Sequence, residues 1–385
     1  MSNVRERLSE KAARNRVPIM SAFELLPVCN LKCKMCYVRK PMSEVKAAGG
    51  LKDAQWWLDH ARQARDCGLL YPLLTGGEPF LYPELFPLLH GLGQLGLQVS
   101  INSNGTLIDR ETAIRLKKDR PVRINLTLYG ASEQSYQNLC GDGDGFRRMV
   151  QGVKFLKEYD IPVKFNASIT PENVKDLEGM IAFAKAQNSP IQVATYMFPP
   201  IRRDSTQIGQ NDRLEPEAAA RARVHADFLQ NDPNWFVMQA SRYGSFVPLE
   251  QIDFEACGHE SMGMMCRAGL CSYWVDWQGN LMNCGMYGSA AVKMEGRPFQ
   301  EAWRELTDLT AQVRYCPPCT RCPNKHLCHP CIAMVSNETG GLTQRPVYMC
   351  EMNQALAKCY KEYVDTYYPG IEPGGNAAPT ESCEL

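Results

Sequence analysis

The sequence predicts an α/β fold in which a partial, TIM-like barrel of six βα units precedes a cysteine-rich, metal-binding region. Three observations lead to this prediction. Short β-rich runs alternate with amphipathic helical runs through the first half of the 385 residues. Three cysteines with the spacing C-x3-C-x2-C follow the first of these β-rich runs. Most of the chain's 17 cysteines lie after residue 256, where the alternation has ended.

The β-rich runs predict six strands. These strands are Ser21–Leu25, Tyr71–Leu74, Gln98–Asn102, Arg123–Leu128, Val163–Ile169 and Ile191–Tyr196. Between them apolar residues recur three and four positions apart, as at Phe146, Met149 and Val150, which is typical of helices that bury one face. Gly68 and Gly96 suit the left-handed ends of two such helices. Six parallel units are too few for a closed eight-stranded barrel, and their functional loops are expected at the carboxyl ends of the strands.

The chain divides into five predicted regions. They are an N-terminal extension (1–18), the partial barrel (19–200), a linker with a bridging helix (201–255), a cysteine-rich domain (256–365) and a tail (366–385). The bridging helix is expected to begin around Pro216, to reach Gln230 and to stop at Pro233. From Cys257 onward we expect little regular structure and a region held together by metal more than by a large apolar core.

Composition narrows the class of protein. The 42 basic residues balance the 42 acidic ones, so the net charge does not indicate a nucleic acid or an acidic membrane as partner. The first 15 residues are charged and do not resemble a signal peptide, and no run of about 18 apolar residues predicts a membrane helix. Cysteine is therefore expected to bind metal in a reducing cytoplasm.

The first three cysteines carry the most specific chemical signal. Cys29, Cys33 and Cys36 can ligate three irons of a 4Fe–4S cluster and leave the fourth iron open, whereas a cluster that only transfers electrons normally takes four thiolates. An open iron implies chemistry on a bound ligand.

A glycine-rich turn follows the second predicted strand, with the sequence Thr75-Gly76-Gly77-Glu78-Pro79. Two glycines let a ligand approach the backbone closely, and the adjacent carboxylate can accept hydrogen bonds from an ammonium group. In isolation the same residues are also compatible with an ordinary strand-to-helix turn.

With both motifs present, the sequence resembles the radical S-adenosylmethionine (SAM) superfamily. The resemblance implies that SAM binds the open iron, with the turn of Gly76, Gly77 and Glu78 holding its amino group. One electron then cleaves SAM to methionine and a 5'-deoxyadenosyl radical, which abstracts a substrate hydrogen. Further implied SAM contacts are Tyr37, Ser103, Asn104, Thr127 and Asn166, several of which can equally be ordinary polar residues of strand ends.

The later cysteines resemble the SPASM extension found on one branch of this superfamily, although paired C-x2-C units alone also suit zinc. The extension implies two auxiliary 4Fe–4S clusters. Ligands of the cluster nearer the barrel would be Cys266, Cys271, Cys284 and Cys331, and those of the outer cluster would be Cys319, Cys322, Cys328 and Cys350. Cys271 aligns less firmly than the others, and without it the nearer cluster has an open iron that can bind a substrate thiolate.

Six cysteines remain, and buried hydrophobic positions are the default expectation for them. They are Cys67, Cys140, Cys257, Cys316, Cys359 and Cys383. Cys140 precedes a glycine-rich run beyond the fourth strand and can face the active site. Cys316 can substitute as a ligand within the neighbouring cluster motif.

The resemblance implies a maturase that forms thioether or carbon–carbon crosslinks in a peptide or protein, or oxidises a side chain. Gly285 stands after Cys284 where sulfatase-maturing relatives have aspartate, which disfavours formylglycine formation. With only a short N-terminal extension, leader recognition is expected to require a separate protein or direct docking of the substrate. A flavodoxin- or ferredoxin-type protein would donate electrons. Two alternatives remain open: the same chemistry on a small metabolite, and a non-catalytic iron–sulfur electron carrier.

Overall fold

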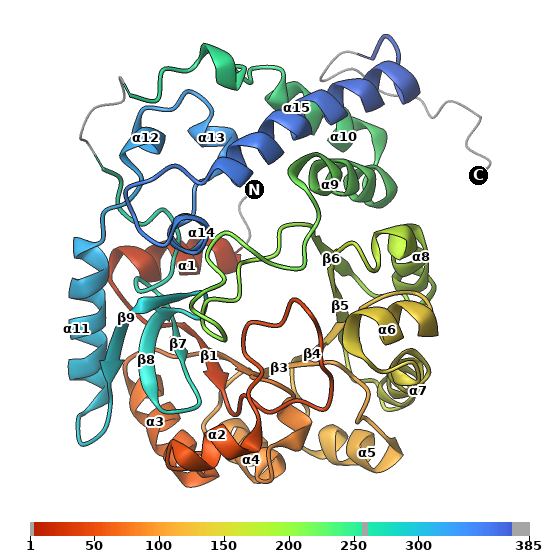
Figure 1. Cartoon of the computed structure of the whole chain (residues 1–385). Helices are drawn as coiled ribbons and strands as arrows, with labels where there is room; N and C mark the ends of the chain where they lie inside the picture. Colours follow the sequence, from red (N-terminus) through yellow and green to blue (C-terminus); the bar gives the residue numbers. More distant parts are fainter. Residues whose placement is uncertain (1–3, 256–260, 372–385) are drawn as a thin grey trace.

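The structure is a computed structural model that describes residues 4–255 and 261–371 (Figure 1). Six parallel strands form its first half, as predicted. They are β1 (Met20–Glu24), β2 (Tyr71–Thr75), β3 (Ser100–Ser103), β4 (Arg123–Thr127), β5 (Val163–Ser168) and β6 (Ile191–Ala194). Each pairs in parallel with the next along the chain. Cys257 and Cys383 lie outside the described residues.

Helices that connect these strands cover the outer side of the curved sheet (Figure 1). They are α3 (Ala54–Asp66), α4 (Leu85–Gln94), α5 (Arg110–Lys118), α7 (Gly145–Glu158) and α8 (Leu177–Ala186). The start of α3 is capped by Asp53, whose side chain accepts a hydrogen bond from the amide of Trp56, and Gly68 follows its end with a φ of +114°. The partial (βα)6 barrel is therefore confirmed.

The second half contains much more regular structure than the sequence suggested. Strand β7 (Ser272–Val275) pairs in parallel with β1, and β8 (Asn280–Cys284) and β9 (Tyr287–Lys293) continue the sheet in antiparallel fashion. In the described part of the chain the sheet thus has nine strands, in the order β6-β5-β4-β3-β2-β1-β7-β8-β9.

Apolar packing holds this added sheet to the barrel, so the expectation of a region held together mainly by metal was wrong. Tyr273 and Val275 alternate along β7 and are buried, and they share one continuous core with Phe23 of β1. Helix α11 (Phe299–Gln312) covers the added strands and buries Phe299 and its neighbours. The alternation along β7 was readable in the sequence, but its pairing with β1 was not.

The bridging helix α9 (Pro216–Gln230) agrees with the prediction. Pro233 does more than end that helix, because it begins α10 (Pro233–Tyr243), whose first turn is capped by Asp232. Further helices are α1 (Val4–Arg14), α2 (Met42–Ala47), α6 (Glu133–Cys140), α12 (Pro317–Thr320), α13 (Lys325–Cys328), α14 (Ile332–Thr339) and α15 (Val347–Tyr367), with short 3-10 turns at Pro79–Leu81, Val174–Asp176 and Leu249–Gln251. Among the described residues, the helices lack the length and apolar character needed to cross a membrane.

Candidate active site and cysteine groups

A cavity of about 350 Å³ lies at the carboxyl ends of the barrel strands, where the fold places functional loops. It brings together most of the residues that the sequence singled out. Its lining includes Cys29, Cys33, Cys36, Tyr37, Gly76, Gly77, Ser103, Asn104 and Thr127. The three cysteines, the glycine turn and the strand-end polar residues therefore face one space.

The three cysteines sit on a loop without regular structure, whose backbone turns toward their sulfurs. The Leu31 amide donates to Cys29 Sγ at 3.4 Å, and the Arg39 amide donates to Cys36 Sγ at 3.3 Å. Burial raises the pKa of the Cys29 thiol to about 12 and also raises the pKa of the Cys36 thiol. A hydrogen bond from Cys140 lowers the pKa of the Cys33 thiol.

This donor set fits a 4Fe–4S cluster. Three thiols that face one cavity supply the ligands for three irons, and the amides that point at two of the sulfurs stabilise thiolates. The rest of the cavity leaves room for a ligand on a fourth iron.

The two glycines of the turn are required by a close backbone approach. A Cβ on Gly76 would stand 2.3 Å from the Leu26 carbonyl oxygen, and one on Gly77 would stand 2.2 Å from that of Val28. The amides of Gly77 and Glu78 donate to these same carbonyls at 2.7 and 2.9 Å. The glycines therefore hold the turn against the segment that enters the cysteine loop, in addition to lining the cavity.

Glu78 does not line the cavity but lies behind its wall, fully buried. Its carboxylate accepts hydrogen bonds from the Phe80 amide (3.1 Å), the Ser103 hydroxyl (2.9 Å) and the Asn104 amide (2.8 Å). Burial raises the pKa of this carboxyl to about 7. The structure thus shows Glu78 fastening the glycine turn to the end of β3, whereas the sequence suggested a direct contact with an amino group.

The end of β3 also contacts the cysteine loop. Asn104 Nδ2 lies 3.7 Å from Cys29 Sγ and 2.9 Å from the side-chain oxygen of Asn30. Asn104 is therefore placed to orient a cysteine sulfur as well as to line the cavity.

Asn166 is not among the residues that line the cavity, whereas Ser168 is. Side chains two positions apart on a strand share a face, and Ser168 is the one nearer the carboxyl end of β5. The sequence identified the correct strand and face but not the residue that reaches the cavity.

Several apolar residues complete the cavity wall without having been predicted. They are Met35 in the cysteine loop, Tyr196, Met197 and Phe198 after β6, and Met286 after β8. Met286 carried no sequence signal, because its position depends on the pairing of β7 with β1.

A buried ion pair joins the barrel to the hairpin that carries Cys284. Arg202 donates to both carboxylate oxygens of Glu24 at 2.9 and 3.0 Å, and to the Gly285 carbonyl at 2.9 Å. Trp274 Nε1 also donates to Glu24, at 2.9 Å. We call Glu24, Arg202, Trp274 and the Gly285 carbonyl the Arg202 clamp.

Tyr37 lies beside this clamp, with the Arg202 guanidinium 5.9 Å from its ring centre. Burial raises the pKa of Tyr37, and the negative charges of Glu24, Cys36 and Cys284 raise it further. One tyrosine therefore neighbours both a cysteine of the first loop and a cysteine of the second half.

In the second half, burial raises the pKa of the Cys266 and Cys284 thiols, and the charge of nearby Cys331 raises both further, so we treat these three cysteines as one group. Cys271 is placed apart from them. Its side chain is fully buried among Ala12 and Ile19 in a small apolar cluster, and its carbonyl accepts the Met20 amide at 3.1 Å. The four residues expected to ligate one nearer cluster are thus not brought together as a set, because Cys271 packs against α1 and the start of β1.

The expected ligands of the outer cluster do come together. Cys319, Cys322, Cys328 and Cys350 line one small cavity. Cys316 adds a fifth thiol, with its Sγ 2.8 Å from Cys319 Sγ. Tyr315 lies between the groups, because thiols of both groups raise its pKa, after the larger effect of burial.

A second cavity, of about 430 Å³, adjoins the first and shares the wall formed by Ala194, Tyr196 and Phe198. It runs along β6, the edge strand of the sheet, and reaches Cys328.

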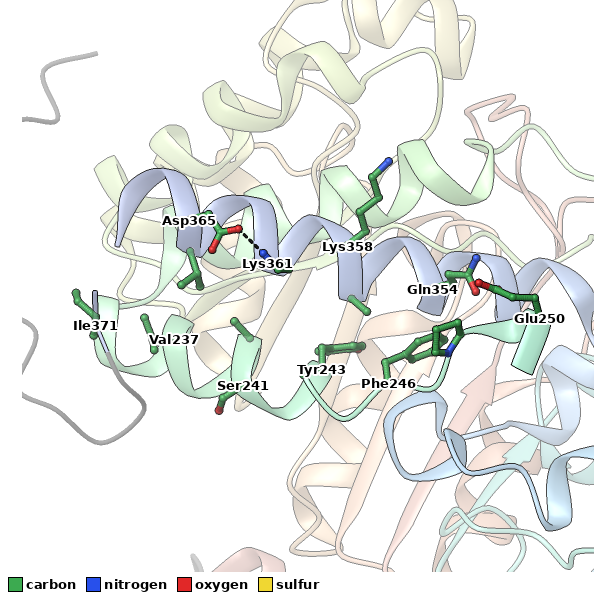
Figure 2. Close-up of a pocket in the computed structure, with 15 residues that line it drawn as sticks. Val237, Ser241, Tyr243, Phe246, Glu250, Gln354, Lys358, Lys361, Asp365 and Ile371 are labelled. Carbon is green, nitrogen blue, oxygen red and sulfur yellow. Dashed lines mark hydrogen bonds and ion pairs between the residues drawn. The ribbon is translucent and has the colours of Figure 1, made fainter. Parts of the chain in front are cut away.

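A third cavity, of about 630 Å³, lies between α10 and α15 (Figure 2). Among the residues that the structure describes, no cysteine lines it, and Lys361 and Asp365 in its lining pair at 2.6 Å. Its size alone does not make it the reaction site, because the thiols and polar strand ends lie elsewhere.

Fold and site together define an α/β partial barrel with a cavity at its strand ends that is lined by three cysteines. Residues 23–184 match the sequence model of the Radical SAM superfamily. The barrel therefore contains a radical SAM domain, and the loop of Cys29, Cys33 and Cys36 lies within the matched residues.

Similar proteins cover most of the chain. The AdoMet-dependent heme synthase of Methanosarcina barkeri is 24% identical over 87% of this chain and 97% of that protein. Among solved structures, Streptococcus suis SuiB bound to its precursor peptide SuiA has a TM-score of 0.64 and 18% identity, covering 89% of this chain and 80% of SuiB. Native anSMEcpe with bound AdoMet has a TM-score of 0.63 and 17% identity, covering 91% of this chain and 97% of that protein. The two structures establish a shared fold along nearly the whole chain.

Proposed function

We propose that this radical SAM enzyme oxidatively modifies a peptide or protein, by crosslinking it or oxidising a side chain. The observation that carries the proposal is the pair of adjoining cavities, one lined by the three-cysteine loop and the other by an open sheet edge. SuiB, whose fold this chain shares, was solved with a precursor peptide bound.

The first cavity is proposed to hold SAM. Cys29, Cys33 and Cys36 would hold the 4Fe–4S cluster, which when bound supplies the electron that cleaves SAM to methionine and a 5'-deoxyadenosyl radical. Gly76 and Gly77 let SAM lie against the backbone of the turn. Ser103, Asn104 and Thr127 offer it hydrogen bonds. The apolar wall of Met197, Phe198 and Met286 keeps water from the reacting atoms.

The second cavity is proposed to admit the substrate. In the described part of the chain β6 pairs only with β5, so its other edge is available to an extended peptide. A peptide can pair with such an edge through its backbone and place one side chain beyond Tyr196 and Phe198 toward SAM. Arg242 in the lining of this cavity favours an acidic group on the substrate, whereas Arg223 is already paired with Asp227 at 3.0 Å.

We further propose that the cysteines of the second half hold two auxiliary iron–sulfur clusters that accept the electron released by substrate oxidation. The outer one would be held by Cys319, Cys322, Cys328 and Cys350. The nearer one would be held by Cys266, Cys284 and Cys331, which leaves one position for a substrate atom. Tyr37 and Tyr315, each near two of the cysteine groups, support an order in which electrons move outward from the SAM site.

Further partners belong to the same proposal. A flavodoxin- or ferredoxin-type protein would supply the first electron, and a separate leader-binding protein would present the peptide. Iron–sulfur clusters of this kind are stable in a reducing cytoplasm, where we expect the protein to work.

A small metabolite is the second candidate substrate. The M. barkeri relative, similar along almost its whole length, is named a heme synthase, which favours a small-molecule substrate. The second cavity can hold such a molecule too, whereas the open edge of β6 favours an extended chain.

The experiment is an anaerobic assay of reconstituted enzyme with SAM and dithionite, which follows 5'-deoxyadenosine and substrate mass. Short peptides encoded beside the gene and an iron porphyrin precursor would be compared. The proposal expects peptide-dependent 5'-deoxyadenosine and a peptide that loses two hydrogens. Turnover with the porphyrin precursor alone would contradict it, and a catalytically silent protein would refute both candidates.

A further inference from the structure

Cys140 occupies a position that the proposed reaction does not use. It is the last residue of α6, which ends at Gly141 with a φ of +70°. The carbonyls of Cys140 and Leu139 accept the amides of Lys32 (2.9 Å) and Lys34 (3.1 Å) from the cysteine loop. Carbonyls at a helix end lack helical partners, so the loop satisfies them and is fixed to α6 in return.

This backbone contact places the Cys140 side chain against Cys33. Leu31, Cys33, Leu139 and Cys140 form a separate small cluster, in which Cys140 has no exposed surface and Cys33 is 8% exposed. The Cys140 thiol is therefore in contact with Cys33. It is the donor to a Cys33 sulfur that ligates iron, because such a thiolate carries no proton.

Tyr129 is a second donor to the same sulfur. Tyr136 fixes the position of Tyr129. The Tyr136 hydroxyl accepts a hydrogen bond from the Tyr129 amide at 3.4 Å, and the two rings are perpendicular with their centres 5.6 Å apart. Tyr129 also lines the first cavity, so this residue contacts both the cysteine loop and the space proposed for SAM.

We propose that Cys140 and Tyr129 are positioning residues that donate hydrogen bonds to the Cys33 sulfur and thereby raise the reduction potential of the SAM-binding cluster. Donors to a ligating sulfur stabilise the reduced, more negative state of a cluster. The effect is directed at one corner of the cluster, since the thiol of Cys140 is sealed among apolar side chains where water cannot replace it. This inference rests on the SAM-binding cluster and does not depend on the substrate.

The test compares Cys140→Ala, Cys140→Ser and Tyr129→Phe in the full-length, reconstituted protein. The midpoint potential is followed by electron paramagnetic resonance (EPR), using the part of the signal that changes on addition of S-adenosylhomocysteine, which occupies the site without being cleaved. Cys140→Ala and Tyr129→Phe should each lower the reduced fraction at a fixed potential about tenfold, which is a shift of about 59 mV for one electron. Cys140→Ser keeps a donor and should stay close to wild type.

Cys359→Ala is the matched control, because Cys359 is equally buried but lies in α15. It should leave the potential unchanged. The proposal is overturned if Cys140→Ala and Tyr129→Phe both retain the wild-type potential, or if Cys140→Ser shifts as far as Cys140→Ala. A protein that responds to the SAM analogue only after Cys140→Ala would also overturn it, since Cys140 would then be an iron ligand. If Cys140→Ala fails to hold iron, the potential of Tyr129→Phe decides, because the loss of that hydroxyl leaves the ring in place.

Discussion

The cysteine loop of the first half and the cysteine groups of the second half place their thiols in different ways. Cys29, Cys33 and Cys36 lie within eight residues of each other, and their arrangement is set by one loop between β1 and α2. The later groups draw thiols from residues 266 to 350, across a hairpin and several short helices. Local spacing therefore determines the first site, while tertiary packing determines the others.

The two regions share a sheet and a buried ion pair, and are not simply connected by a linker. β7 extends the barrel sheet directly, and the Arg202 clamp ties β1 to the turn after Cys284. The second half is thus built onto the barrel, which explains how cysteines far apart in sequence can lie close to the first cavity.

The largest expected effect comes from removing the local site. Changing Cys29, Cys33 and Cys36 together to alanine should abolish 5'-deoxyadenosine formation and remove one cluster's iron, because no thiol ligand remains in the loop. Iron analysis and product assays under anaerobic conditions measure both. Retained SAM cleavage would show that this loop is not the cleavage site. The loss of all iron would show that the two regions do not bind iron independently.

Breaking the Arg202 clamp should have the next largest effect. Arg202→Met leaves the buried Glu24 carboxylate without its cation, which costs about 3–5 kcal/mol of unfolding free energy. Iron bound near Cys284 should fall as well, since Arg202 donates to the adjacent Gly285 carbonyl.

The matched control is Arg62→Met, which breaks an exposed pair with Asp59 and should cost less than about 1 kcal/mol. Chemical denaturation of both variants gives the comparison. Equal losses for the two variants would mean that the clamp is only a surface-like contact.

The same local and non-local distinction explains what the sequence could predict. The six strands, α9 and the three-cysteine loop followed from periodicity and spacing, which are local properties. Two predicted SAM contacts were placed wrongly: Ser168 lines the cavity where Asn166 was expected, and Glu78 lies behind the cavity wall. How far a side chain at a strand end reaches depends on the neighbouring strands, which the local sequence does not specify. The positions of Met286 in the cavity wall and of Cys271 beside α1 could not be predicted from the sequence, since both depend on the pairing of β7 with β1.

Glu78 provides a pH-dependent test within the local site. Its carboxyl pKa rises from 4.5 to about 7 on folding, so its protonated form is favoured in the fold. The resulting stability is fully present below pH 4.5 and is lost as the pH rises through about 7, a change of about 3 kcal/mol.

Glu78→Gln stays neutral at every pH and should lack this slope. Thermal unfolding without SAM between pH 5.5 and 8 should show wild type losing stability relative to the variant as the pH rises. Parallel curves for the two proteins would show that the buried carboxyl is already ionised at the lowest pH.

The smallest effect should come from Cys271, and it separates packing from ligation in the second half. Cys271→Ala removes one buried sulfur from the cluster of Ala12 and Ile19, which costs about 1 kcal/mol and should leave the iron content unchanged. Cys331→Ala, by contrast, removes a thiol from the group of Cys266 and Cys284 and should lower the iron content and alter the EPR signal of an auxiliary cluster. If Cys271→Ala loses as much iron as Cys331→Ala, metal binding must draw Cys271 away from α1, and the nearer cluster would then have four thiolates and no open position.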